Sequence, residues 1–497
     1  MKVWICLYIE SPNRKQTAHR KNEKLRYRNA LTIHLTATLA DSQQQEEIMK
    51  KVKEIFSDFY TVDDAITMDF QTVRNLQETY SNKLKVQLSG AKYFTRAENA
   101  SFIDHTGAKH VDMMGAVGVM TVGNNNSFVW EQIEKVFKAK SYAMGAISYH
   151  NIAAAFYRNL ALTTPGQRLT KAQTAGGGAE AIEGVIKLCK IANRAKPYKT
   201  KVLATVNAFH GKTTGAVSAG GSEKWQAYQG RLLLDQMAHI PYNDVAALEK
   251  ELSTGIYQGF IVEPIQGEGG VFVASDEFMK KARELCDKYD TIFVCDEIQT
   301  GCCRTGKFWA CEWYDVVPDV IAFAKGISGG IIPLAGYIAK AEIYDAAYGT
   351  PETAFHHTAT YQGNAYACAA GIGALQFMLE NDLCSQALKN GETIMNAMKE
   401  AQKKYPGIIK EVRGRGCLIG VEFEPVKPEL QERYGSSWAM ECERYFSEEF
   451  RIQIMHSFNN PKVFRWLPPL TATKEDIEYA LNAFDASAKR VYELAGK

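Results

Sequence analysis

Short apolar runs alternate with helical stretches along the middle of the chain, and this alternation restricts the fold more than any other feature. Four runs of four to six residues are rich in residues that favour strands. They are Lys201–Val206, Gly259–Val262, Thr291–Cys295 and Val320–Phe323. They alternate with helical patterns, for example at residues 179–190 and 276–288. Because the runs are apolar throughout, we predict strands buried on both faces of a largely parallel α/β sheet.

The chain is too long for one small core. It has 497 residues, of which 46% are hydrophobic and 23% charged, as in an ordinary globular protein. We predict an α/β fold with a large domain, a smaller α/β domain and an N-terminal extension. The predicted boundaries are 1–45 for the extension, 46–105 for a segment that contributes to the small domain, 106–375 for the large domain and 376–497 for the C-terminal small domain.

The N-terminal extension is basic. Residues 11–30 hold seven Lys or Arg against one acid, which favours a solvated, partly disordered arm over a targeting segment. From residue 43 to residue 60 the apolar spacing predicts a helix.

Several classes of function are disfavoured by composition. The net charge of +2 gives no reason to expect a nucleic-acid partner. No apolar run approaches the roughly 18 residues that cross a bilayer, so we expect no membrane association. The 11 cysteines show no paired CxxC spacing, and the adjacent His356 and His357 have no third ligand at suitable spacing, so we expect no metal. We predict a cytoplasmic enzyme with reduced thiols.

Reactive side chains follow the predicted strands. "IVEPIQGEGG" places Glu263 and Glu268 after one strand, and "CDEIQTG" places Asp296 and Gln299 after the next. "IAFAKGISGG" delivers Lys325 into a glycine-rich loop, and "TAGGGAEAIEG" is a glycine turn that opens a helix. Ligands of such sheets bind beyond the carboxyl ends of the strands, so we expect these segments to form one site.

A carboxylate, a lysine and an anion-binding helix start are what pyridoxal 5′-phosphate (PLP) requires. The lysine binds the aldehyde covalently, the carboxylate pairs with the ring nitrogen, and free backbone N–H groups hold the phosphate. A buried Asp296 would then have a cation as its partner. Taken singly, each feature has a plainer interpretation: Asp296 as a turn or helix cap and Lys325 as a solvent-facing side chain.

The glycine turn also satisfies a dinucleotide-binding pattern, with Gly176, Gly178 and Ala181 at the required spacing. Two observations argue against it. The preceding "RLTKAQTA" is no convincing strand, and about 20 residues further on the chain is basic where a ribose-binding acid is needed. We therefore favour PLP over NAD.

Seven segments occur in the order found in one known family. They are "AFHGKTTGAVSA", "VEPIQGEGGV", "DEIQTGCCRTGKFWACE", "PDVIAFAKGISGG", "HTATYQGNAYACAA", "EVRGRGCLIGVEF" and "RWLPPLTAT". Over roughly residues 85–490 the chain resembles the class III (ω-) aminotransferases of PLP fold type I, most closely their putrescine and ornithine aminotransferase branch.

The resemblance implies roles around the cofactor ring. Lys325 would bind PLP covalently and, once released by the incoming amine, move the proton during transfer. Asp296 would keep the ring nitrogen protonated, and Gln299 would hydrogen-bond the phenolic oxygen.

The resemblance also implies how the ring and phosphate are held. Phe209 would stack on one face of the ring and Ile298 would pack on the other. Backbone N–H groups of Gly178 and Ala179 would bind the phosphate. Thr360 would reach the phosphate from the neighbouring protomer, which implies a homodimer. Relatives often carry a hydroxyl residue near this glycine turn, and this chain does not.

On the substrate side, Arg465 matches the arginine that grips the carboxylate of a 2-oxo acid. Glu268 matches the acid that pairs with this arginine when the substrate has no carboxylate there, and Glu263 would be a supporting hydrogen-bond partner. Lys212 follows Phe209, His210 and Gly211, and we expect it close enough to the cofactor to help hold a distal carboxylate of the substrate.

The leading hypothesis is transamination from a terminal primary amine to 2-oxoglutarate or pyruvate. The donor would be a diamine such as putrescine or cadaverine, or an ω-amino acid. Alternatives are another PLP fold type I reaction (aminomutase, racemase or decarboxylase), an aminotransferase for a secondary-metabolite amine or aldehyde, and a scaffold without catalysis.

Overall fold

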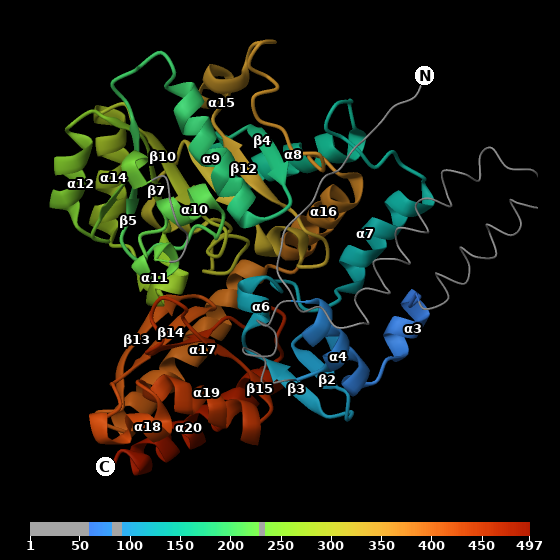
Figure 1. Ribbon diagram of the computed structural model, residues 1–497, viewed down its shortest axis with the longest axis vertical. Coiled ribbons are helices and arrows are strands. Elements are labelled where there is room, and N and C mark those ends of the chain that lie inside the picture. The colour runs from blue at the N-terminus through green and yellow to red at the C-terminus, as the bar shows by residue number, and fades with distance from the viewer. Residues whose placement is uncertain (1–58, 82–91, 228–233) are drawn as a thin grey trace, which may run out of the picture. The chain divides into compact units, whose positions relative to one another are not determined.

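The computed structural model describes residues 59–81, 92–227 and 234–497 (Figure 1). The chain divides into two compact units, residues 1–91 and 92–497. The described helices of the first unit are α3 (Val62–Thr67) and α4 (Phe70–Tyr80). The predicted arm and nearly all of the predicted helix at 43–60 lie outside the described residues, and the predicted domain boundaries stay a prediction.

A seven-stranded sheet forms the centre of the second unit, in the order β4-β12-β11-β10-β7-β5-β6. Its strands are β4 (Lys171–Ala175), β5 (Lys201–Thr205), β6 (Met237–Ile240), β7 (Tyr257–Val262), β10 (Ile292–Asp296), β11 (Val320–Phe323) and β12 (Ala335–Ala339). All neighbouring pairs from β11 to β6 are parallel, whereas β12 runs antiparallel to both of its neighbours. The predicted α/β class with a mostly parallel large sheet is confirmed.

Strand β4 corrects the sequence analysis, in which "RLTKAQTA" was judged no convincing strand. That judgement was wrong: Lys171 to Ala175 pair with Ala339 to Ala335 of β12 in unbroken antiparallel register. The run contains few β-branched residues because it lies at the edge of the sheet, where its first residue is exposed. Pairing with β12, rather than local propensity, makes it a strand.

Both faces of the large sheet are covered by helices. Helix α9 (Gly178–Ala192) buries its apolar side in one cluster with Val294 and Ile261. The neighbouring residue Phe293 points to the other face, into the cluster that contains Phe278 of helix α14 (Asp276–Lys288). Because successive strand residues alternate between faces, strands covered on both sides must be apolar throughout, as the sequence indicated.

Besides the two-stranded sheet of β8 (Ile265–Gln266) and β9 (Phe272–Val273), the described part of the second unit has two four-stranded sheets. The first has the order β13-β14-β17-β16, and the other has the order β1-β2-β3-β15. Their strands are β1 (Phe94–Glu98), β2 (Ser101–Asp104), β3 (Lys109–Asp112), β13 (Ile409–Arg415), β14 (Leu418–Phe423), β15 (Ile452–Gln453), β16 (Met455–His456) and β17 (Val463–Trp466). Helices α17 (Leu383–Lys404), α19 (Trp438–Glu449) and α20 (Lys474–Leu494) contribute to a core with these strands.

The remaining elements are short or lie at the periphery of the large sheet (Figure 1). They are α6 (Gly115–Gly118), α7 (Ser127–Lys138), α8 (Asn151–Thr163), α10 (Thr214–Ala219), α11 (Glu223–Gln226), α12 (Val245–Leu252), α13 (Gly267–Gly270), α15 (Ala341–Tyr348), α16 (Ala365–Glu380), α18 (Gln431–Tyr434), the strands β8 (Ile265–Gln266) and β9 (Phe272–Val273), and the 3₁₀ turns η2 (Pro165–Gln167), η3 (Leu234–Gln236), η4 (Ala310–Tyr314), η5 (Lys325–Ser328) and η6 (Pro428–Leu430).

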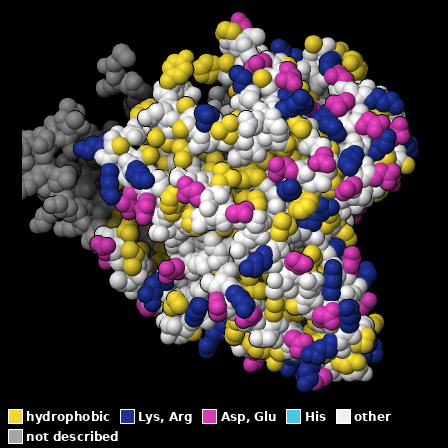
Figure 2. Space-filling view, turned by 180° about the vertical axis from the view of Figure 1, so that it is seen from behind, with side chains coloured by type: hydrophobic (Ala, Val, Ile, Leu, Met, Phe, Trp, Pro, Cys, Tyr) yellow, Lys and Arg dark blue, Asp and Glu magenta, His cyan; other side chains and the backbone are white. Residues whose placement is uncertain are grey.

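The surface shows no segregation of charge on the face drawn in Figure 2, where acidic and basic side chains are interspersed. Within the described ranges, every helix is too short or too polar to cross a bilayer.

Candidate active site

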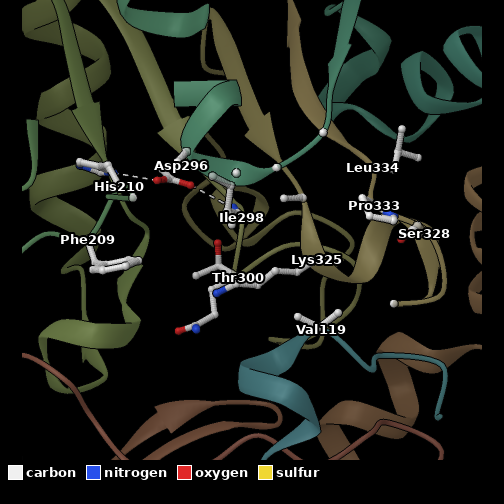
Figure 3. Close-up of a pocket in the computed structure, with 18 of the residues that line it drawn as sticks. Val119, Phe209, His210, Asp296, Ile298, Thr300, Lys325, Ser328, Pro333 and Leu334 are labelled. Carbon is white, nitrogen blue, oxygen red and sulfur yellow. Dashed lines mark hydrogen bonds and ion pairs between the residues drawn. The ribbon is translucent and has the colours of Figure 1, made fainter. Parts of the chain in front are cut away.

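A cavity of about 570 Å³ opens at the carboxyl ends of β7, β10 and β11 (Figure 3). Segments far apart in the sequence meet there. Residues that line it and carry polar or ring groups are Phe209, His210, Glu263, Glu268, Asp296, Gln299, Thr300, Lys325 and Ser328. The glycine turn from Gly176 to Ala179 lines the same cavity. The structure therefore brings together most of the residues that the sequence analysis singled out.

Asp296 is the last residue of β10 and is buried, so its charge needs a partner. Its Oδ2 lies 2.7 Å from Nδ1 of His210, and its Oδ1 accepts a hydrogen bond from the backbone N–H of Ile298 at 3.1 Å. Burial alone would lower the pKa of His210, but its hydrogen bond to the Asp296 carboxylate and the charges of Asp296 and Glu263 together raise it above its ordinary value. The imidazole of His210 is thus the polar partner of one carboxylate oxygen of Asp296.

Lys325 follows β11 and begins the turn η5. Its φ of 52° is in the left-handed region, where a non-glycine residue costs of order 1–3 kcal/mol. Burial lowers the pKa of its amine to about 8, although the charge of Glu268 acts in the opposite direction. About a tenth of the amine is therefore uncharged at pH 7, far more than for an ordinary lysine, and the uncharged amine is the nucleophile.

The glycine turn joins β4 to α9. The helix starts at Gly178, and its N-cap residue, Gly177, provides no side-chain hydrogen bond. A Cβ at position 178 would lie 3.1 Å from Cδ1 of Ile298 and 3.6 Å from Cβ of Ala324. Glycine thus permits close approach of the loop after β10, and leaves backbone N–H groups at the helix start to bind an anion.

Phe209 and Ile298 both border the cavity beside Asp296 (Figure 3). Oε1 of Glu263 accepts the backbone N–H of Phe209 at 2.9 Å, and Oε2 accepts that of Gly267 at 3.3 Å. Burial raises the pKa of Glu263 to about 7. Glu263 therefore ties the segment of Phe209 to the segment that carries Glu268.

Gln299 has one satisfied and one unsatisfied polar group. Its Nε2 donates to the backbone oxygen of Val117 at 3.3 Å, whereas its buried Oε1 has no partner among the described residues. A Cβ at Gly267 would come within 1.6 Å of that Oε1, so position 267 must be glycine while Gln299 points this way. An unsatisfied buried amide beside a cavity is a natural contact for a ligand.

Arg465 and Glu268 form a buried ion pair. Nη1 of Arg465, which lies in β17, is 2.7 Å from Oε1 of Glu268. Burial alone would raise the pKa of Glu268, but the charges of Arg465 and Lys325 and the hydrogen bonds to the carboxylate together lower it. Oε2 of Glu268 also accepts the backbone N–H of Phe458 at 3.1 Å. The buried Nε of Arg465 has no partner among the described residues, so its N–H can donate a hydrogen bond to a ligand.

Thr360 is the one residue of the predicted set that the single chain does not bring to the site. It is exposed, in the segment between α15 and α16, and it does not line the cavity. This placement agrees with a residue that would act on a neighbouring protomer.

Sequence reasoning missed His210, Thr300 and Ser328 as lining residues. His210 directly follows Phe209 in "AFHG", and the need of Asp296 for a buried partner was the signal that could have found it. Thr300 lies in the same loop as Gln299, and Ser328 lies in the same loop as Lys325. Their places at the cavity follow from these loops.

These residues fit PLP. The buried carboxylate of Asp296 can pair with a ring nitrogen, the Lys325 amine can bind an aldehyde, and the uncapped start of α9 can bind a phosphate. The unsatisfied Oε1 of Gln299 is a further polar contact at the same cavity.

Comparison with known proteins gives a consistent result. The family model for class III aminotransferases matches residues 85–487. An uncharacterised aminotransferase of Schizosaccharomyces pombe is 51% identical over 428 residues, which are 86% of this chain and 88% of the yeast protein. The crystal structure of ornithine aminotransferase from Toxoplasma gondii superposes with a TM-score of 0.78 at 25% identity, covering 88% of this chain and 100% of that one.

A second structure of ornithine aminotransferase from Toxoplasma gondii contains PLP at partial occupancy in the active site. It superposes with a TM-score of 0.77 at 26% identity and covers 88% of this chain and 98% of its own.

Proposed function

The chain belongs to the class III aminotransferase family and is a PLP-dependent enzyme, and on this premise we propose that it moves the amino group of a terminal primary amine to a 2-oxo acid. The buried pair of Arg465 and Glu268 beside Lys325 carries this proposal. With the ion pair closed the site suits an amine without a carboxylate at this position, and with the pair open it suits a 2-oxo acid.

In this proposal each residue has a defined task. When bound, PLP supplies an electron sink for the carbon that bears the amino group. Lys325 binds the cofactor covalently, and its freed Nζ then moves the proton from that carbon. Asp296, supported by His210, keeps the ring nitrogen protonated. Gln299 binds the phenolic oxygen.

The remaining residues hold the cofactor in place. Phe209 and Ile298 pack on the ring, and the backbone N–H groups of Gly178 and Ala179 bind the phosphate. Glu263 orients Phe209 through its backbone N–H.

The two states of the Arg465–Glu268 pair account for two half-reactions. While a donor without a carboxylate at this position is bound, Glu268 neutralises Arg465, so no buried charge is left alone. When a 2-oxo acid enters, its carboxylate takes the place of Glu268 and binds the guanidinium in two-point fashion. The acceptor in this proposal is 2-oxoglutarate or pyruvate.

The donor is placed among terminal amines: a diamine such as putrescine or cadaverine, or an ω-amino acid. The likeness to ornithine aminotransferases supports this choice, since ornithine carries a terminal amine. An assignment to the putrescine branch rests on the sequence resemblance alone.

We further propose a homodimer. Large apolar side chains are exposed in two segments, with Ile147 and Tyr149 in the first and Phe355 and Tyr361 in the second. The segments lie side by side, because Ala365 donates its backbone N–H to the oxygen of Ala143. The second segment carries Thr360, so a second copy on this surface would present that residue to the neighbouring site.

An experiment on Arg465→Ala tests the two-state site. We expect kcat/KM for the 2-oxo acid to fall by about 10- to 100-fold, the loss of one charge-assisted interaction. The rate with the amine donor alone, followed by the cofactor absorbance, should change several-fold less. Arg433→Ala, at an exposed arginine, is the matched control. Equal losses in both half-reactions would contradict the assignment.

A further inference from the structure

Two lysines lie against one tryptophan near the active-site cavity. Nζ of Lys212 is 4.2 Å, and Nζ of Lys224 is 5.1 Å, from the centroid of the Trp225 ring. The Lys212 ammonium is also 5.7 Å from the ring centroid of Phe458. An indole attracts cations to its faces, so the ring keeps each of the two ammonium groups beside it. We call Lys212 and Lys224 the lysine pair.

The tryptophan is anchored between the cavity wall and the segment of Phe458. Its ring packs edge-on against Phe209, which lines the cavity, with 6.3 Å between centroids. It packs in the same manner against Phe458, with 6.2 Å between centroids. The indole N–H donates to Oδ1 of Asn459 at 2.5 Å. Since the N–H of Phe458 binds Glu268, the lysine pair lies close to the Arg465–Glu268 switch.

The positive charge of the lysine pair is not compensated by acids among the described residues. Neither ammonium forms an ion pair there, and the hydrogen bond of Lys224 goes to the backbone oxygen of Phe458 at 2.7 Å.

An ammonium group at the far end of a substrate would meet like charges here, and the Trp225 ring already holds the lysine cations. A carboxylate would meet two cations instead. Arg465 does not compete for it while Glu268 neutralises the guanidinium. The local positive charge therefore favours an ω-amino acid over a diamine, the two kinds of donor that the proposed function leaves open.

We propose that the lysine pair, positioned by Trp225, binds an acidic group at the far end of the amine donor. The substrate is then an ω-amino acid rather than a diamine. This inference rests on the proposed transamination and narrows its donor.

Donors of equal chain length and different charge test the inference. The holoenzyme is given 4-aminobutanoate, 1-aminobutane or 1,4-diaminobutane, and kcat/KM of the donor half-reaction is measured from the cofactor absorbance. The corresponding acids, neutral amines and diamines with five and six carbons test longer distances between the reacting amine and the far end of the donor. We expect the acid to exceed the neutral amine by at least about tenfold, and the diamine to be the poorest.

Variants test whether the preference for an acidic donor depends on the lysine pair. Lys212→Gln combined with Lys224→Gln should reduce the ratio of acidic to neutral donor by at least about tenfold. Trp225→Leu should reduce the same ratio, whereas Trp225→Phe should retain most of it because an aromatic face remains. Lys250→Gln, an exposed lysine on α12, should keep the wild-type ratio. A diamine that outperforms the acid, or a ratio unchanged in the double variant, would overturn the inference.

Binding without reaction gives an independent readout. Butanoate, which has no amino group, should bind the holoenzyme in a calorimetric titration and should bind the double variant at least about tenfold more weakly. Equal binding by both proteins would overturn the inference. If no donor of any charge transferred its amino group, the proposed function would fail, and the butanoate titration would still decide the role of the lysine pair.

Discussion

Lys325 shows how strongly its position in the fold changes the pKa of a side chain. Its amine ends in a buried cavity, held by a left-handed backbone, and burial lowers its pKa to about 8. Asp296 is likewise buried, and its Oδ2 lies 2.7 Å from Nδ1 of His210. Both residue types are common in proteins, and only their place in the cavity gives them a chemical role.

The pKa of Lys325 leads to a prediction for cofactor capture. An amine attacks an aldehyde only when it is uncharged, so covalent capture of PLP by the apo-protein should accelerate about tenfold per pH unit below pH 8 and level off above it. Capture is measured by stopped-flow absorbance, and by borohydride fixation of the cofactor to the protein between pH 6 and pH 9.5.

The control for this measurement is Lys325→Ala, which should fix no cofactor at any pH. A capture rate that keeps rising about tenfold per pH unit from pH 8 to pH 9.5 would show that the amine titrates like an ordinary lysine, and would contradict the role of burial.

The sequence largely predicted the residues that line the cavity. It did not predict the contacts that these residues make with one another. Asp296 and Lys325 each follow an apolar strand, so the carboxyl-end rule placed them together. His210 was missed because the residue that neutralises a buried acid comes from a different strand connection. The partner of Arg465 was known only through the family resemblance, since nothing local links residue 465 to residue 268.

At the scale of elements, the sequence signal was accurate where an element is buried on both faces. The predicted strand Val320–Phe323 and helix 276–288 coincide with β11 and α14. Strand β4 was missed because an edge strand of Lys, Ala, Gln and Thr has neither periodicity nor an apolar run. Its existence depends on β12, more than 150 residues further along the chain, and single-sequence patterns do not report such pairings.

The short helix α13 gives a prediction at this scale. A methyl group at Gly267 would meet Oε1 of Gln299 at 1.6 Å, so Gly267→Ala must move Gln299 away from the cavity. We expect a loss of about 1–3 kcal/mol in the free energy of unfolding from overpacking, and PLP affinity reduced by up to about tenfold through loss of one hydrogen bond. Denaturant unfolding of the apo-protein and PLP titration measure the two effects.

The matched control is Gly166→Ala. Its φ of 60° strains alanine, a conflict that Gly267 does not have, but the nearest atom to the new Cβ is 3.7 Å away, so it lacks the steric conflict of Gly267. It should lower stability by about 1 kcal/mol and leave PLP affinity unchanged. Equal PLP affinity in both variants would contradict a cofactor contact by Gln299.

At the scale of the whole molecule, the single chain leaves one predicted contact unmade. The cavity has its carboxylate, lysine and helix start, yet Thr360 is exposed and outside it. Sequence patterns describe one chain, so the contribution of a second copy entered only through the family resemblance. The exposed apolar side chains in the same segment give that expectation a physical basis.

Mixed dimers test whether Thr360 acts on its neighbour. The Lys325→Ala protein should be inactive, and Thr360→Ala should lose activity at limiting PLP because the phosphate loses a hydrogen bond. When the two are unfolded together and refolded in equal amounts, half of the dimers should be mixed, and each mixed dimer contains one site with both residues intact. Activity at limiting PLP should then reach about a quarter of the wild-type value by random association. If Thr360 served the site of its own chain, no site in any mixed dimer would be intact, and the mixture would show only the average of its two parents.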